Sequence, residues 1–356
     1  MDNFIKELVA RFDYIKGRRD NWDTHYQDLA DYMLPRKADI VRKRSRGEKR
    51  MELIFDGTAL QAVDLLSASL HGMLTSGATP WFHLDMKDAE IGRDDDVQGW
   101  LEDSSQRMIR AFNQSNFETE VHEMYVDLVV FGTGCMFIEM DNETLRFSTR
   151  HISEFYVQEN QYGIVDTVFR KYKTPARQVV QRFGVDNVTD YILKQFEKKP
   201  DEEVDILHVV LPRINRDPNK VDNKNMPFAS FYIDMETKSL LSESGFEDMP
   251  YVVPRFLKST GETMGRSPAM VALPDVKMLN LMSKTIIQAA QKQIDPPLLV
   301  PDDGFILPVR TQPGGLNFYR AGTRDSITPL QAGANIPIGL SMEDQRRMAI
   351  RSAFYV

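Results

Sequence analysis

Two clusters of charged side chains are the strongest candidates for chemistry in this sequence. Residues 36–50 bring together eight lysines and arginines against two acidic residues, a composition typical of surfaces that bind nucleic acid. Within this stretch we expect Arg42, Lys43, Arg44 and Arg46 to contact DNA or a neighbouring subunit. A solvated surface loop explains the same composition equally well, so both interpretations stay open.

The second cluster is acidic and lies within residues 85–103. Carboxylates at positions 85, 88, 90, 94, 95 and 96 could hold a divalent metal, as in a metal-dependent nuclease. Their spacing matches no calcium-binding loop, however. A solvated turn is therefore the favoured interpretation of this cluster.

Motifs of the common enzyme classes are absent from the sequence. No Gly-x-x-x-x-Gly-Lys-Ser/Thr loop is present to cradle phosphates, which argues against an ATPase. The six histidines are scattered, and the single cysteine, Cys135, lies in an apolar run where a buried, inert thiol is expected. We therefore predict no enzyme activity, no catalytic residue, no cofactor and no metal. A metal-dependent DNA-processing enzyme or a DNA-binding module is the alternative.

The net charge of −8 restricts how the protein could interact with nucleic acid. Proteins that grip DNA tightly usually have a basic excess, because neutralisation of phosphates drives their affinity. A protein that lets DNA slide needs an acidic surface with only a few basic residues, since such a surface repels phosphate. The acidity disfavours a repressor or clamp and is compatible with a conduit. No apolar run is long enough for a membrane span and no secretory signal is present, which predicts a protein made in the cytoplasm.

The elements that hold these clusters follow an α+β pattern. Hydrophobic periodicity predicts a helical first third, with helices over residues 4–17, 22–34, 59–74, 97–115 and 117–131. The rest of the chain up to residue 260 is predicted as short strands, at 135–140, 145–147, 155–158, 165–172, 206–211, 228–234 and 252–256, with helices near 175–183 and 188–196. Residues 81–85 also alternate like a strand, and Trp22, Trp81 and Trp100 are expected in the core.

The longest predicted helix runs over residues 267–294. Ser267 is a suitable N-cap, Pro268 a suitable first helical residue, and Pro296-Pro297 end the helix. Its polar face carries Lys277, Asn280, Lys284, Gln288 and Gln291, and another face carries Leu279, Met282 and Ile286. No acidic residue occurs between Val276 and Ile294.

The end of the sequence is predicted to hold one more helix. Residues 298–300 form a short predicted strand, and a stretch rich in glycine and proline follows. The last helix is predicted from Ser341, because Ser341 and Asp344 resemble a capping box. It stops at Val356 on apolar residues, which suggests that the natural polypeptide continues.

Several motifs together resemble the portal (head-to-tail connector) protein family of short-tailed tailed bacteriophages. In chain order they are Trp22…Tyr32-Met-Leu-Pro35, Phe55-Asp-Gly-Thr-Ala59, Leu66-Ser-Ala-Ser-Leu70, Trp81-Phe82, Phe131-Gly-Thr-Gly134, Gly265-Arg-Ser-Pro268, Asp275-Val-Lys-Met-Leu-Asn280, Pro296-Pro297 and Pro313-Gly-Gly315. No single motif is specific. Their order and spacing extend along nearly the whole chain.

The resemblance implies an α+β, portal-type fold with a helical/β wing domain, a long stem helix and a small α/β clip. Such subunits assemble as a ring of about twelve copies. Residues 1–263 would be the wing, with a helical part, 1–131, and a mixed strand and helix part, 132–263. Residues 264–294 would be the stem helix and 295–335 the clip and return segment. Residues 336–356 would be a second stem helix or a wing/tunnel helix, with the crown missing.

The resemblance also implies a function and partners. The ring would be the channel for packaging and ejection of double-stranded DNA at the capsid vertex of the virion, assembled in the bacterial cytoplasm. Its partners would be the terminase large subunit, a tail adaptor, and capsid and scaffolding proteins. Lys277, Lys284, Gln288 and Gln291 would then line the channel, and Leu279, Met282 and Ile286 would pack between neighbouring stems. Arg310, Arg320 and Arg324 would dock partners on the clip.

Overall fold

The fold was obtained as a computed structural model of residues 1–356. The structure describes residues 2–43, 45, 47–88, 90–141, 144–217, 219–220, 222–299, 328–329 and 336–356. Within these ranges the chain forms helices and antiparallel sheets, which confirms the α+β class. The clip arginines Arg310, Arg320 and Arg324 lie outside the described residues, as do Arg44 and Arg46.

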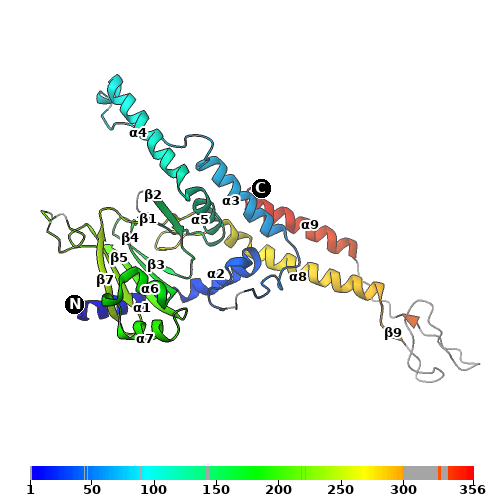
Figure 1. The fold of residues 1–356 in the computed structure, drawn as a ribbon. Helices are drawn as coiled ribbons and strands as arrows, with labels where there is room; N and C mark the ends of the chain where they lie inside the picture. The colour runs from blue at the N-terminus through cyan, green and yellow to red at the C-terminus, as the bar shows by residue number, and fades with distance from the viewer. Residues whose placement is uncertain are drawn as a thin grey trace, which may run out of the picture.

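Helices dominate the first third of the chain, as predicted. They are α1 (Asp2–Arg18), α2 (Asp20–Met33), the short η1 (Pro35–Lys37), α3 (Thr58–Leu74), η2 (Ile91–Arg93), α4 (Asp95–Gln114) and α5 (Phe117–Phe131). Gly132 ends α5 in a left-handed conformation that favours glycine. Figure 1 shows α4 projecting away from the body.

A five-stranded antiparallel sheet forms the second half of the body, in the order β3-β4-β5-β6-β7. Its strands are β3 (Phe155–Glu159), β4 (Val165–Pro175), β5 (Glu203–Pro212), β6 (Phe228–Asp234) and β7 (Ser239–Phe246). Alternate residues point to opposite faces. Leu207 and Phe231 contact α1 on one face, whereas Ile206 and Tyr232 contact α6 (Ala176–Phe183) and α7 (Asp190–Lys198) on the other. The sheet is thus covered on both faces.

A smaller sheet, β2-β1-β8, joins the large sheet to the helices. It consists of β1 (Met136–Asp141), β2 (Thr144–Thr149) and β8 (Tyr251–Val252). The buried His208 of β5 links the two sheets, since its Nδ1 lies 2.7 Å from the Tyr251 hydroxyl and its Nε2 2.9 Å from the Ser230 hydroxyl. Burial, aided by nearby arginines, lowers the pKa of His208 well below its ordinary value. This histidine is therefore a neutral packing residue.

The long helix α8 (Pro268–Ile294) and the last helix α9 (Ile336–Ala353) form an antiparallel pair that extends from the body (Figure 1). Their buried sides join α2, α3 and α5 in the main hydrophobic core. The helix α9 begins before Ser341, the predicted start, so the capping-box prediction was wrong. The short strands β9 (Leu298–Leu299) and β10 (Thr328–Pro329) pair with each other.

Three further predictions were wrong. Residues 81–85 form no strand. Instead of lying on opposite faces of a sheet, Trp81 and Phe82 both pack against helices: Trp81 contacts Phe112 of α4 and Phe117 of α5, and Phe82 contacts Phe112. Trp100 and Trp81 are not core residues, since their exposed fractions are 66% and 37%. The strand predicted at 252–256 covers only Tyr251–Val252, whereas β7 was missed. Trp22, by contrast, packs against the core.

Candidate functional site

The long helix α8 is anchored where its first turn meets the end of α5. The Ser267 hydroxyl caps the helix by accepting from the Met270 amide, as predicted, and it donates to the Val130 carbonyl at 2.8 Å. The Thr133 hydroxyl accepts from the Gly265 amide at 2.8 Å. A β-carbon on Gly132 or Gly265 would strike the backbone of the other glycine. The motifs Gly132-Thr-Gly134 and Gly265-Arg-Ser-Pro268 are thus in close backbone contact, and we call this contact the joint.

The predicted channel residues occupy two different environments. The Lys277 ammonium lies 2.7 Å from Asp28 of α2 and near the Tyr32 ring, so its charge is paired within the chain. Lys284 is exposed, with its ammonium 5.5 Å from the Phe55 ring centre. Gln288 and Gln291 are exposed near the C-terminal end of α8, beside Lys292 and Asp295. The open polar surface is therefore restricted to the outer half of the helix.

The residues predicted to pack between stems face mainly their own chain. Leu279 is only 1% exposed and lies in the main core, so its assignment to a subunit contact was wrong. The physical reason is that α9 covers this side of α8. Ile286 is half-buried and lies close to Gly339 of α9. Met282 is half-buried, on the flank of the contact with α9.

Asn280 is not part of the polar face, contrary to the prediction. Its side-chain oxygen accepts from the backbone amides of Phe55 and Asp56 at 2.7 and 3.1 Å, and its amide group donates to the Val276 carbonyl. Periodicity placed Asn280 with the lysines, because it does not show which polar residue is buried. In the sequence, the only signal that set Asn280 apart was its position at the end of the motif Asp275-Val-Lys-Met-Leu-Asn280.

An ion-pair network continues from Asp56 to α9. The Arg347 guanidinium lies 2.9 Å from Asp56, 3.0 Å from Glu343 and 2.8 Å from Asp344. Glu343 also accepts from the buried Ser283 hydroxyl of α8 at 2.7 Å. This network fixes the segment before α3 to both long helices, and no sequence pattern indicated it.

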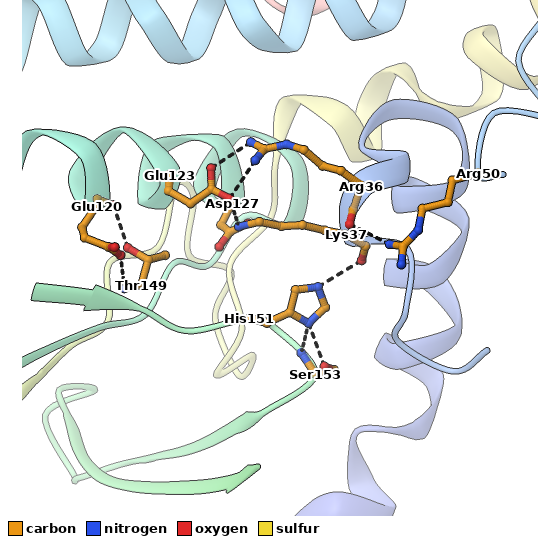
Figure 2. Close-up of polar contacts among 9 residues, drawn as sticks. All are labelled: Arg36, Lys37, Arg50, Glu120, Glu123, Asp127, Thr149, His151 and Ser153. Carbon is orange, nitrogen blue, oxygen red and sulfur yellow. Dashed lines mark hydrogen bonds and ion pairs between the residues drawn. The ribbon is translucent and has the colours of Figure 1, made fainter. Parts of the chain in front are cut away.

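Several of the described cations of residues 36–50 are paired within the chain. Figure 2 shows Arg36 and Lys37 reaching the carboxylates of α5. Arg36 forms two hydrogen bonds to Glu123, and the Lys37 ammonium lies 2.9 Å from Glu123 and 2.6 Å from Asp127. Arg50 donates to the Arg36 carbonyl at 2.7 Å (Figure 2). It also pairs with Asp39.

The candidate contact residues of the same loop are less constrained. Arg42 lies 3.5 Å from Asp31, and Lys43 is exposed. The loop therefore has a base that is clamped to α5 and a solvated part around Arg42 and Lys43.

His151 also contacts the segment of Arg36 and Lys37, and we call the contacts of this segment with α5 and His151 the clamp. The ring Nδ1 of His151 accepts from the Ser153 amide, so its Nε2 carries the proton and donates to the Lys37 carbonyl at 3.0 Å (Figure 2). Burial raises the pKa of Asp127 despite the adjacent Lys37. For Glu123 the opposing effect of burial is outweighed by Lys37 and Arg36, which lower its pKa. Nearby, Glu120 accepts from the Thr149 amide and fixes β2 to α5 (Figure 2).

The acidic cluster gathers at the outer end of α4, where Asp94 caps the helix by accepting from the amides of Asp96 and Val97. Across the described ranges no three or more His, Cys, Asp or Glu side chains converge as a metal site would require. Cys135 is fully buried, and burial raises the pKa of its thiol well above the ordinary value. None of the helices in the described part of the chain is long and apolar enough to cross a membrane.

These features define an elongated α+β protein, in which a sheet-containing body holds a projecting pair of long helices. Comparison with known families agrees with this class. The family model "Bacteriophage head to tail connecting protein" matches residues 5–356, so the chain belongs to that family.

Named relatives in the family are phage proteins. The chain is 30% identical to the "Probable portal protein" of Bordetella phage BPP-1 over 98% of its length, and 32% identical to the "Portal protein" of Salmonella phage epsilon15 over 99%. It is 22% identical to the "Portal protein" of Enterobacteria phage T3 over 97%. The chain spans just under two thirds of these relatives, 64%, 65% and 64% of their lengths. Neither the family nor these relatives are described as a nuclease or a DNA-binding module, so those alternatives are not supported.

Proposed function

We propose that this protein is a portal subunit, a non-enzymatic part of a ring that conducts double-stranded DNA into and out of a phage head. The observation that carries the proposal is the family match along the whole chain, together with the projecting α8–α9 pair. A long helical pair with one uncharged side and one polar side suits a subunit that contacts its neighbours and surrounds a channel.

The regions follow the same scheme. We assign residues 1–263 to the wing, 264–294 to the stem, and 295–335 to the clip and return segment. The antiparallel packing of α9 against α8 favours a second stem helix for residues 336–356 over a wing/tunnel helix. On the clip, Arg310, Arg320 and Arg324 would dock the terminase large subunit and the tail adaptor, and capsid and scaffolding proteins would contact the wing at the capsid vertex.

The channel surface is assigned to Lys284, Gln288 and Gln291, with Lys277 contributing less because Asp28 pairs with it. Between Val276 and Ile294 the helix has no acidic residue, although the chain as a whole has a net charge of −8. Repeated around a ring, Lys284 forms one basic belt in an acidic protein. Such a belt contacts passing phosphates weakly, while the surrounding negative charge limits retention.

The proposal is tested by measuring the mass and shape of the purified protein. Light scattering should give a particle of about twelve times the 41.0 kDa subunit, and negative-stain electron microscopy should show rings with a central hole. A protein that remains monomeric over the micromolar range would contradict the proposal.

A further inference from the structure

One side of α8 is apolar and largely exposed, and no other element covers it within the part of the chain that the structure describes. Val271, Met278 and Leu281 are 72%, 46% and 66% exposed. Together with Met282, Thr285 and Ala289 they recur at three-, four- and seven-residue spacing, and so share one face of the helix. We call these six residues the α8 stripe. None of these six residues is charged, and Lys292, three residues after Ala289, follows them on the same face in the last turn.

Apart from the open polar side of Lys284, Gln288 and Gln291, the other sides of α8 contact elements of the same chain. Asp275 and Ser283 bond to Arg346 and Glu343 of α9, Lys277 pairs with Asp28 of α2, and Asn280 accepts from the segment before α3. Even the one hydroxyl of the stripe is satisfied internally, because Thr285 donates to the Leu281 carbonyl at 2.8 Å. The stripe thus presents methyl and thioether groups to solvent. Soluble proteins rarely leave a continuous apolar surface of this kind uncovered.

A complementary surface lies on α3. The helices α8 and α3 both pack against α9. The outward side of α3 carries Leu65, Ala68 and Gly72, all exposed. The small residues Ala68 and Gly72 leave room for the large side chains of the α8 stripe. The Ser69 hydroxyl of α3 is also satisfied within the helix, by the Leu65 carbonyl.

The charges beside the two surfaces are opposite. Apart from His71, the exposed Asp64 is the only residue of α3 with an ionisable side chain. The charges on α8 after Val276 are lysines alone, and Lys284 and Lys292 are exposed. A second α8 would therefore be repelled from the α8 stripe, whereas α3 would be attracted to it.

We propose that the α8 stripe of one subunit packs against the outward side of α3 in the next subunit. This inference rests on the proposed ring, and it identifies the seam of that ring. The contact joins two different surfaces, so each added copy can repeat it until the ring closes. It also leaves the side of Lys284, Gln288 and Gln291 free to face the channel.

Photo-crosslinking tests which surfaces meet, without assuming their register. A photoreactive benzoylphenylalanine introduced at Leu281 should yield covalent dimers and larger species, with the crosslinked peptide mapping within residues 58–74. The same group introduced at the exposed Tyr162, in the β3–β4 turn, is the control and should give no such peptide. Rings that assemble normally but crosslink from Leu281 to another α8, or to no second copy, would overturn the seam and leave the proposed function standing.

A charge substitution provides an independent readout. Leu281→Glu should raise the protein concentration needed for ring assembly roughly tenfold or more, since a buried leucine is replaced by a charge. Ile214→Glu, at an exposed isoleucine that follows β5 and lies outside α3 and α8, should assemble like the wild type. Equal assembly by both variants would refute the seam. A wild-type protein without rings would contradict the proposed function, and the seam with it.

Discussion

The contact between Gly132 and Gly265 allows a direct test of how the long helix is held. In Gly132→Ala the new β-carbon would lie 2.5 Å from the Gly265 carbonyl oxygen and 2.7 Å from the Arg266 carbonyl carbon. Gly132 also has a φ of 75°, where a β-carbon costs roughly 1–2 kcal/mol. Relief of the clash requires the two backbones to separate, which adds about 1–3 kcal/mol. We expect a total loss in the free energy of unfolding of about 2–5 kcal/mol.

Gly261 provides a matched control. Its φ is 84°, in the turn closed by the Glu262 amide and the Ser259 carbonyl, but a β-carbon there would meet no atom within 4 Å. Gly261→Ala should therefore show only the backbone cost of roughly 1–2 kcal/mol. Thermal unfolding, followed by circular dichroism at equal protein concentration, should give a melting temperature several degrees lower for Gly132→Ala than for Gly261→Ala. Equal melting temperatures would refute the idea that the two motifs form a close-packed joint.

Three further outcomes are expected. Asn280→Ala should cost about 1–3 kcal/mol, because the Phe55 and Asp56 amides lose their acceptor, and Asn280→Asp should cost less in the same thermal assay. Lys37→Ala should cost about 3–5 kcal/mol at pH 7, because it leaves Asp127 buried without a counter-charge. Burial raises the pKa of Asp127, so this carboxylate takes up a proton and becomes neutral on acidification. The loss in free energy of unfolding of Lys37→Ala relative to the wild type should therefore shrink between pH 7 and pH 5. A loss that grows over this range would contradict this account. Lys284→Ala should leave rings intact and lower DNA retention modestly in filter binding at low salt, with no difference at high salt; loss of rings would show that Lys284 is part of a subunit contact.

The wild-type clamp has a pH dependence of its own. Lys37 and Arg36 lower the pKa of Glu123, so this group stabilises the fold above its unfolded pKa and loses that contribution as the pH falls. Asp127 acts in the opposite sense, since its folded pKa is raised. The two carboxylates lie on one turn of α5 and share Lys37, which makes the lysine the residue on which both depend.

Much of the local structure follows from the sequence because it depends on local signals. The span 117–131 was predicted as a helix with the bounds of α5, and Ser267 and Pro268 begin α8 as a cap and a first residue should. Several of the strands lie where short apolar runs are bounded by turn residues. These signals act between residues close in the chain, so a single sequence displays them.

The sequence also contained the motifs that identify the family, although not their structural roles. Gly132-Thr-Gly134 and Gly265-Arg-Ser-Pro268 were separate motifs until the fold placed them in contact. Similarly, Arg36 and Lys37 were indistinguishable from the other cations of residues 36–50, until α5 brought Glu123 and Asp127 beside them. Long-range pairing of this kind depends on how helices pack, which composition and periodicity do not record.

The sequence by itself determined that α8 is a long helix with apolar and polar faces. Only the tertiary structure decided which of those faces the chain uses for itself. Because α9 packs on Leu279 and Ile286, these residues stabilise the subunit, and the uncovered apolar surface shifts to Val271, Met278 and Leu281. Asn280 is buried for the same kind of reason, as the segment before α3 covers it. Helical periodicity fixes the angle between two side chains, but a neighbouring element from a distant part of the chain determines which of them is exposed to solvent.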